Sequence, residues 1–463
     1  MISGQALQQS LGGGTDTIAA LGTPHGRGAI AVVRLSGGSA FEIAGRHINP
    51  WPINAREARL CTVYDGNQLL DQAVVTIYVA PQSFTGENIV EISTHGGHVV
   101  PASVMSALIG SGAREALPGE FTRRAVLNGK LDIVQAEAIG DLIDAQSSAM
   151  QHAALHQLDG GLSARIGSLR QGILLLESLI AYDMDFPEED DGPVSSDRII
   201  DAIDGLLGSL DVLLSTIPVG EIVREGAVVV IAGEPNVGKS SLFNALLGEN
   251  RAIVTEIPGT TRDAIEGLIN AGRWPIRLLD TAGLRKSRDR VEQLGIETSE
   301  RYVSKAHMVL ACGDSEASLA RILVVLLKVS TAPVLGLLTK CDLNSEVKPK
   351  QSGPQSTTYV RVSTVTGEGL GLLQHEMESC LTRTYGELTP ELPVLMRARH
   401  VQAVRIARTE IGEFREAWTS GLLPVPVAAV HLRMAVGAME SLIGAVSADD
   451  VLERLFSSFC VGK

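Results

Sequence analysis

A glycine-rich run at residues 233–240, GEPNVGKS, has the spacing G-x-x-x-x-G-K-S. It follows the apolar run VVVIA and precedes the helical SLFNALLG, and the motif is trustworthy only in such a strand–loop–helix context. Backbone N–H groups of this turn and of a helix N-terminus can cradle phosphates. We expect Lys239 to reach the β and γ phosphate oxygens and Ser240 to bind Mg²⁺. The predicted phosphate-contacting residues are Asn236, Val237, Gly238, Lys239, Ser240 and Ser241.

Two later segments complete the predicted phosphate site. GTTRD (259–263) offers Thr261 as a second Mg²⁺ ligand that senses the γ-phosphate. The segment DTAG (280–283) places Asp280 near the metal and leaves Gly283 free to turn its N–H toward the γ-phosphate. The nucleotide-binding residues predicted here are Thr255, Glu256, Ile257, Pro258, Gly259, Thr260, Thr261, Asp280, Thr281, Ala282 and Gly283.

The segment TKCD (339–342) resembles the guanine-selecting pattern N-K-x-D, with Thr339 in place of the asparagine. Asp342 can accept both the N1–H and the exocyclic amine of guanine, which adenine does not offer. VSTVTGEGL (362–370) then resembles the loop that lies under the base. The predicted base-contacting residues are Thr339, Lys340, Asp342, Ser363 and Thr364. Together the motifs indicate a GTPase of the Ras-like superfamily.

Leu284 directly follows DTAG, where many GTP hydrolases carry a glutamine that orients the attacking water. One alternative is therefore a protein that binds GTP without hydrolysing it. The amide oxygen of Asn236 and carbonyls of EIPGTTRD (256–263) instead predict a monovalent cation in place of an arginine finger, whose effect is roughly 10³–10⁵ in rate. Glu292, downstream, either steers water or is an ordinary exposed helix charge.

The composition limits the classes of protein that fit. Its 463 residues suggest about three domains, and 45% apolar residues are enough for real cores. We find no apolar run of the ~18 residues that span a bilayer, and the N-terminal sequence does not read as a secretory signal. A net charge of −14 disfavours a chain that grips RNA by itself. The scattered cysteines, at 61, 312, 341, 380 and 460, disfavour disulfides and structural zinc.

The chain divides by the period of its apolar residues. Short β-type runs over 17–100 indicate an α/β or α+β module that ends near Lys130. From there to about residue 220, apolar residues step by three and four, as helices require. Over 224–384, buried-strand runs alternate with helix-length segments, which predicts a doubly wound parallel sheet. The helical pattern resumes after Leu392, so the α/β domain is predicted to be inserted into a helical one.

The chain resembles the bacterial and organellar tRNA-modification GTPase family MnmE, also called TrmE. The GTPase motifs and four further segments carry the resemblance, and FCVGK, which ends the chain, is highly specific. The four segments are DTIAALGTPHGRGAIAVVRLSG (16–37), SFTGENIVEISTHGG (83–97), PGEFTRRAVLNGKLDIVQAEAIGDLI (118–143) and FCVGK (459–463). The resemblance covers essentially the whole chain after residue 15.

The resemblance implies a multidomain α/β and α protein. Its parts would be an N-terminal α+β tetrahydrofolate-binding domain that also dimerises, a central helical domain, and an inserted Ras-like P-loop GTPase domain with a doubly wound sheet. On this sequence they become a flexible leader at 1–15, an N-terminal domain at 16–130, a discontinuous helical domain at 131–222 and 386–463, and a GTPase domain at 223–385.

The resemblance also implies how hydrolysis is triggered. In the family, K⁺-dependent dimerisation of the GTPase domains starts it, and the matching K⁺ positions are Asn236, Thr255, Ile257 and Thr260. The matching Mg²⁺ ligands are Ser240 and Thr261. Glu292 matches the family's catalytic glutamate, and Arg262 falls in the switch segment that moves on dimerisation. The predicted catalytic set is thus Asn236, Lys239, Arg262 and Glu292.

The implied pathway is tRNA modification in the bacterial cytoplasm, without a membrane. With an FAD-dependent partner (MnmG), in a heterotetramer or larger, the family installs an aminomethyl or carboxymethylaminomethyl group on C5 of the wobble uridine. tRNA is expected to be held mainly by the partner, and the carbon to come from 5,10-methylene-tetrahydrofolate, with 5-formyl-tetrahydrofolate as a further ligand. The matching folate positions are Arg34, Glu91, Lys130 and Lys463. The ordinary alternatives are a surface ion pair for Arg34 or Lys130 and a solvated tail for Lys463. Cys460 is either a small buried apolar residue or a reactive thiol near the folate.

Two other functions compete with this one. A ribosome-assembly GTPase would be an RNA-binding switch, and it would need a basic RNA-binding module that the acidic sequence does not display. A folate-binding scaffold with a vestigial GTPase is disfavoured by the intact set Lys239, Ser240, Thr261 and Asp280. Hydrolysis of GTP in K⁺ compared with Na⁺ separates the active enzyme from the scaffold.

Overall fold

The computed structural model describes residues 16–185, 196–249, 265–280, 302–343, 359–389, 393–421, 424–444 and 462. Contacts divide the chain into two compact units. The first comprises residues 1–140 and 440–463, and the second comprises residues 141–439. The domain boundaries drawn from the sequence stay a prediction, and each unit is described separately below.

A seven-stranded sheet forms the first unit, with the strand order β3-β4-β5-β6-β2-β1-β7. Most neighbours are antiparallel and joined by short connections, and only β1 and β7 run parallel. The strands are β1 (Ile18–Leu21), β2 (Ile30–Ser36), β3 (Ile48–Asn49), β4 (Arg59–Asp65), β5 (Gln68–Tyr78), β6 (Ile89–His95) and β7 (Arg114–Glu115). Helices α2 (Ala40–Gly45), α3 (Val99–Gly110), α4 (Glu120–Leu127) and most of α5 (Ile133–Ile143) complete the unit.

The two faces of this sheet differ in their cover. Strand residues alternate between faces, and on one face Val33, Ile92 and Val75 pack with residues of α2 and α3 in the main core. On the other face, Phe121 of α4 packs over Ile18 and Ala20 of β1. On that second face Val32, Arg34 and Glu91 stay half-buried, whereas Ser36 and Ile89 at one end of it are buried. This partly open face carries two of the predicted folate residues.

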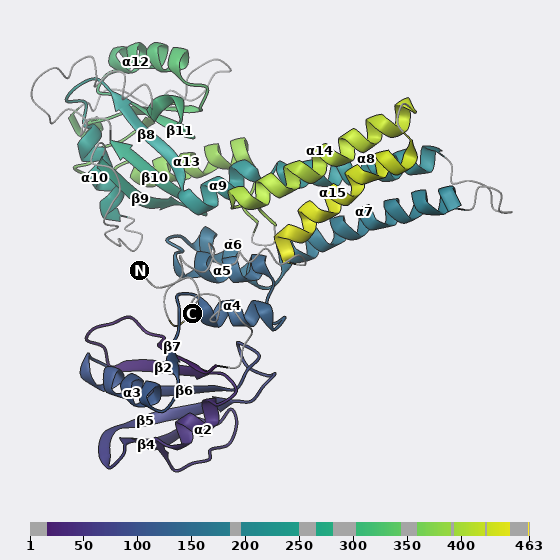
Figure 1. Cartoon of the computed structure of the whole chain (residues 1–463). Coiled ribbons are helices and arrows are strands. Elements are labelled where there is room, and N and C mark those ends of the chain that lie inside the picture. Colours follow the sequence, from purple (N-terminus) through teal and green to yellow (C-terminus); the bar gives the residue numbers. More distant parts are fainter. Residues whose placement is uncertain are drawn as a thin grey trace, which may run out of the picture. The chain divides into compact units, whose positions relative to one another are not determined.

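The second unit contains a six-stranded sheet in the order β13-β12-β11-β8-β10-β9 (Figure 1). Its strands are β8 (Ala227–Gly233), β9 (Ile265–Ala271), β10 (Trp274–Asp280), β11 (Met308–Gly313), β12 (Val334–Leu338) and β13 (Tyr359–Arg361). All neighbours are parallel except β9, which pairs antiparallel with β10. The sheet is thus parallel, as the sequence predicts, except at this edge. Only Gly272 and Arg273 separate the two strands, and a parallel neighbour needs a far longer crossover.

Helices lie on both faces of that sheet. Val229 and Ile231 of β8 face a core shared with α10 (Lys239–Glu249) and α13 (Leu370–Tyr385). Val230 faces the opposite core, to which α12 (Glu316–Val329) contributes Leu319 and Leu326. Because the strands are covered on both sides, their sequences are nearly continuous apolar runs. The carboxyl ends of the parallel strands therefore meet at one edge, where the phosphate and base motifs follow them.

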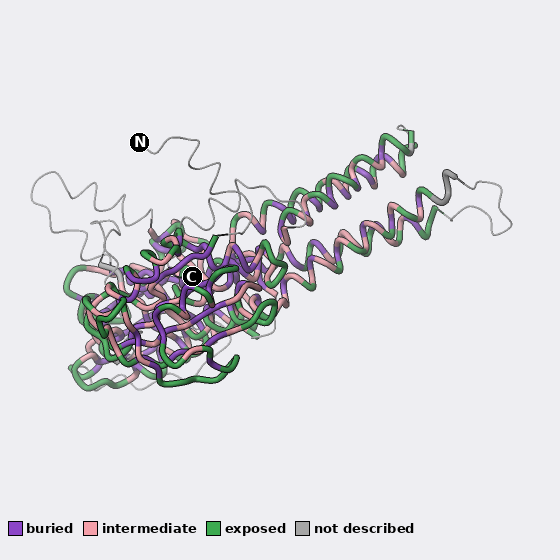
Figure 2. Tube along the Cα trace, turned by 60° about the horizontal axis from the view of Figure 1, so that its bottom comes forward, coloured by how far each residue is buried: buried purple, intermediate pink, exposed green. Residues whose placement is uncertain are grey.

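The rest of the second unit is helical. Its helices are α6 (Ser148–Leu158), α7 (Gly161–Asp185), α8 (Ser196–Leu214), α9 (Ile217–Glu225), α14 (Ala398–Ser420) and α15 (Val425–Ile443). The long helices run side by side, with their buried residues on the facing sides (Figures 1 and 2). Two stretches, Ser196–Glu225 and Pro426–Ile443, are long and apolar enough to cross a membrane by length and composition alone, a test that helices in soluble cores also pass. The first forms ion pairs with α14 through Asp204 and Asp211.

Helix α9 joins the part of the second unit that contains the six-stranded sheet to its helical part. Its Ile222 belongs to the core under β8 and β10, whereas Val219 and Val223 pack in a second core with Val394. Gly220 makes this possible, because a Cβ there would lie 2.2 Å from the carbonyl oxygen of Leu395. The chain therefore reaches the six-stranded sheet through α9 and leaves this part through residues 394–395, and these two segments pack against each other.

Candidate nucleotide site

The phosphate loop lies between β8 and α10, as the motif predicts. Asn236 has φ 63° and Gly238 has φ 96°, both in the left-handed region that lets a loop turn its N–H groups inward. Lys239 is 7% exposed, and its Nζ donates to the carbonyl oxygens of Gly233 at 3.1 Å and Glu234 at 2.9 Å. The ammonium is thus already positioned over the loop, where phosphate oxygens can replace carbonyl oxygens as its partners.

Ser240 and Asp280 meet at the end of β10. The Ser240 hydroxyl donates to Oδ2 of Asp280 at 2.7 Å, and Asp280 is 1% exposed. A hydroxyl and a carboxylate at this spacing are the hard oxygen ligands that Mg²⁺ takes together with substrate phosphates. The described residues contain no group of three His, Cys, Asp or Glu side chains that would hold a metal unaided. The pair therefore fits Mg²⁺ brought in with a nucleotide.

The base-recognition loop contacts the phosphate loop directly. Lys340 Nζ donates to the carbonyl oxygen of Asn236 at 2.7 Å, and the Thr339 hydroxyl donates to the carbonyl oxygen of Val237. Ser363 is fully buried, and its hydroxyl donates to Oδ1 of Asp342 at 2.6 Å. This bond orients the carboxylate that is predicted to select guanine.

The structure thus brings together the predicted residues from four distant segments. Those that lie around the carboxyl ends of β8, β10, β12 and β13 are Asn236, Val237, Gly238, Lys239, Ser240, Ser241, Asp280, Thr339, Lys340, Asp342, Ser363 and Thr364. Other predicted residues lie outside the described residues, namely Thr255, Glu256, Ile257, Pro258, Gly259, Thr260, Thr261, Arg262, Thr281, Ala282, Gly283, Leu284, Glu292, Cys460 and Lys463.

Glu234 is a structural residue of the phosphate loop that the sequence analysis missed. Its carboxylate accepts from Arg321 Nε at 3.0 Å and from the Ser318 hydroxyl at 3.0 Å, both on α12. The hydrogen bonds from Arg321 and Ser318 hold the pKa of Glu234 below its usual value. The arginine also offsets a negative charge beside the phosphate site. Nothing in the motif pattern signals this contact, because the partners lie more than 80 residues away in sequence.

Two of the predicted folate residues form a pair on the partly open face of the first sheet. Arg34 of β2 and Glu91 of β6 are direct register partners, and Arg34 Nε lies 2.8 Å from Glu91 Oε1. Their side chains stay 32% and 25% exposed, so a ligand can reach them. Burial and the neighbouring Glu91 raise the pKa of Tyr78, which therefore stays a neutral hydroxyl beside the pair. Lys130 instead donates to the carbonyl oxygen of Pro81 at 3.1 Å.

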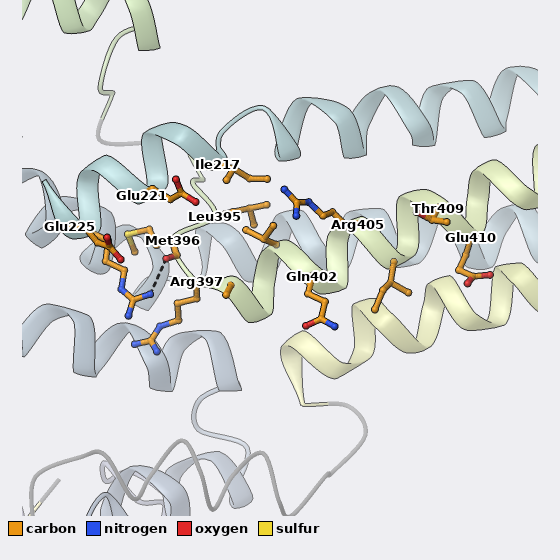
Figure 3. Close-up of a pocket in the computed structure, with 14 residues that line it drawn as sticks. Ile217, Glu221, Glu225, Leu395, Met396, Arg397, Gln402, Arg405, Thr409 and Glu410 are labelled. Atoms are coloured by element: carbon orange, nitrogen blue, oxygen red, sulfur yellow. Dashed lines mark hydrogen bonds between the residues drawn. The ribbon is translucent and has the colours of Figure 1, made fainter. Parts of the chain in front are cut away.

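A cavity of about 620 Å³ lies in the helical part of the second unit, between α9, residues 395–397 and α14 (Figure 3). Apolar side chains such as Leu395 and charged ones such as Arg405 line it, and Arg224 bonds the carbonyl oxygen of Met396 at 3.3 Å within it. None of the predicted site residues lines this cavity. Its lining contains both acids and arginines, so its charge does not single out one class of ligand.

Comparisons with known proteins cover nearly the whole chain. A family model described as "MnmE helical domain" matches residues 133–460, and one described as "GTP-binding protein TrmE N-terminus" matches residues 17–130. Proteins named tRNA modification GTPase MnmE are similar over 97% of this chain. The one from Moorella thermoacetica is 37% identical, with 99% of its length covered, and the one from Aquifex aeolicus is 36% identical, with 100% covered.

Solved structures were also matched. The G domain of the T. maritima FeoB iron transporter is 26% identical, with a TM-score of 0.26, over 35% of this chain and 99% of that one.

Proposed function

We propose, from the premise that the chain belongs to the MnmE family of tRNA-modification GTPases, that K⁺-dependent pairing of two nucleotide-binding domains switches on its GTP hydrolysis. Membership makes the chain a GTP hydrolase of tRNA modification. The proposal concerns what replaces the missing water-orienting side chain at Leu284. A K⁺ ion, when bound, supplies the positive charge that an arginine finger brings elsewhere.

The geometry of Asn236 is the observation that supports this proposal. Its backbone carbonyl is engaged by Lys340, and its left-handed φ of 63° places it at the exposed rim of the phosphate loop. Within the described residues, no hydrogen bond engages its side-chain amide. An amide oxygen in this place suits a weakly held monovalent cation. We propose Thr255, Ile257 and Thr260 as its further ligands, and Glu292 as the residue that steers water.

The proposal is tested by GTP turnover of the full chain in equimolar KCl and NaCl with Mg²⁺ present. We expect kcat to be about 10²-fold higher in KCl, a conservative part of the roughly 10³–10⁵ that an arginine finger supplies. Light scattering with a transition-state mimic such as GDP with aluminium fluoride should show self-association in KCl only. Equal rates in the two salts would rule out the cation, and no turnover in either would point to a GTP-binding scaffold.

We also propose that the first unit binds a tetrahydrofolate and joins two copies of the chain. The Arg34–Glu91 pair supports this, because a half-buried carboxylate can accept two N–H groups from the guanidine-like edge of a pterin. The guanidinium of Arg34 lies 2.8 Å from that carboxylate and orients it. Lys130 and Lys463 are proposed to meet the glutamate tail. The folate would supply the one-carbon unit of the modification.

Replacing Glu91 with glutamine is expected to weaken binding of 5-formyl-tetrahydrofolate by about tenfold, because a charge-assisted hydrogen bond becomes a neutral one. Isothermal titration of the full chain measures the change. Glu115→Gln is the matched control, since Glu115 is exposed in the same unit and should leave the affinity unchanged. Unaltered binding by Glu91→Gln, in a protein that melts normally, would remove Glu91 from the folate site.

The complete modification is proposed to need an FAD-dependent partner of the MnmG type. The net charge of −14 supports a division of labour in which the partner holds most of the tRNA. The product would be an aminomethyl or carboxymethylaminomethyl group on C5 of the wobble uridine, made in the bacterial cytoplasm. Nucleoside analysis of tRNA from a deletion strain, with and without the restored gene, tests this assignment.

A further inference from the structure

We propose that the candidate nucleotide site of the second unit binds guanine without a hydrogen bond to N7 of the base. Thr339 then acts as a positioning residue, whose hydroxyl bonds the base-recognition loop to the phosphate loop. The inference rests on guanine-nucleotide binding at the site, and it names which atoms of the base are read. It follows from the surroundings of a single buried hydroxyl.

Thr339 directly follows β12, and its side chain points into the protein. The residue is 4% exposed, and its backbone N–H donates to the carbonyl oxygen of Gly313 at 2.9 Å. Its hydroxyl lies within hydrogen-bond distance of two carbonyl oxygens, that of Val237 and, at 3.2 Å, that of Gly313. Both of these neighbours can only accept a hydrogen bond.

A hydroxyl has one proton to donate. In Thr339 that proton points to one of the two backbone carbonyls, and the closer one belongs to the phosphate loop. Guanine N7 is itself only an acceptor. The hydroxyl therefore has nothing left to offer N7. An asparagine at this position would carry two amide protons, so that one could hold the Val237 carbonyl while the other reached the base.

Selection of guanine then depends on Asp342. Ser363 donates to its Oδ1 at 2.6 Å, and the carboxylate keeps free lone pairs for the N1–H and the exocyclic amine. Thr339 serves the site in another way. With Lys340, it bonds the consecutive carbonyls of Val237 and Asn236, so the base loop sets the position of the phosphate loop.

The test compares GDP with 7-deaza-GDP, which lacks N7 as an acceptor, by isothermal titration of the full chain. For the natural protein we expect the two Kd values to agree within about twofold. For Thr339→Asn we expect GDP to bind about fivefold more tightly than 7-deaza-GDP, since a neutral hydrogen bond of ordinary strength is gained. A natural protein that prefers GDP over 7-deaza-GDP by fivefold or more would overturn the inference.

Thr339→Val and Thr339→Ser separate positioning from base contact. Valine keeps the shape of the side chain and removes its hydrogen bond to the Val237 carbonyl oxygen. Both GDP and 7-deaza-GDP should therefore bind about tenfold more weakly, and the ratio of their Kd values should stay near one. Serine keeps the hydroxyl and should restore natural affinity. A changed ratio in Thr339→Val, or unchanged affinity for both nucleotides, would contradict the assigned role. If the natural protein does not bind GDP at all, the site is not a guanine-nucleotide site, and the inference fails together with that proposed function.

Discussion

Replacing Asn236 with glycine is expected to abolish the K⁺ stimulation of GTP hydrolysis, and to lower kcat in KCl by about 10²-fold, to the level seen in NaCl. The substitution removes the amide oxygen proposed to hold the cation. Glycine is preferred to alanine, because Asn236 has φ 63° and a Cβ in the left-handed region is strained. Steady-state phosphate release in the two salts measures the effect.

A control must separate the loss of the Asn236 side-chain amide from the effect of placing a glycine at a position with a left-handed φ. Arg56 also has a left-handed φ, of 62°, in the first unit, and Arg56→Gly should leave turnover and its K⁺ dependence unchanged. Binding of GDP by Asn236→Gly should stay within about threefold of the natural value, since the Lys340 bond uses the backbone carbonyl. Full K⁺ stimulation in Asn236→Gly would mean that the cation is held without this amide.

The second large effect is on stability. Arg124→Ala is expected to lower the unfolding free energy of the first unit by about 3–5 kcal/mol, because it removes the buried guanidinium that pairs with Glu87 and leaves Glu120 with Arg114 as its remaining cation. Arg124 is 8% exposed at its side chain and lies 2.8 Å from Asp16, 3.1 Å from Glu87 and 3.0 Å from Glu120. Hydrogen exchange of peptides from β1, β2 and α4, followed by mass spectrometry over a urea series, localises the loss to this unit.

The exposed pair of Arg46 with Glu42 provides the matched control. Its side chains are 55% and 68% exposed, so Arg46→Ala in the same unit should cost only about 0–1 kcal/mol. The cluster consists of Arg124 with Asp16, Glu87 and Glu120. Equal losses of unfolding free energy for Arg46→Ala and Arg124→Ala would show that the buried guanidinium does not stabilise this cluster.

The same cluster predicts how stability depends on pH. Burial by itself raises the pKa of Glu120, but hydrogen bonds from Arg114, the Leu117 N–H and Arg124 outweigh it and hold that pKa below its ordinary value of 4.5. A carboxyl with a lowered folded-state pKa contributes stability above its ordinary pKa and loses it as the pH falls through the folded value. The first unit should therefore weaken below about pH 4.5, and Arg124→Ala should flatten that dependence.

Much of the nucleotide site could be predicted because its motifs are local. A strand, a glycine-rich turn and a helix N-terminus suffice to place Lys239 and Ser240, and all of them lie within one short segment. Strand β9 is harder to predict from local sequence. Its sequence IEGLINA lacks the continuous apolar run of a strand covered on both faces, which is typical of an edge.

The sequence by itself determined the family, the order of the phosphate and base motifs, and the kinds of side chain each contributes. These are properties of short segments, in which both the types of the functional residues and their spacing can be read directly from the sequence. Only the tertiary structure decided that Glu234 is held by Arg321, that Arg34 pairs with Glu91, and that the Thr339 hydroxyl is engaged by the phosphate loop. Such contacts join residues that are 57 to 102 positions apart. Their partners are chosen by strand order and register, which come from how buried surfaces fit across the whole unit.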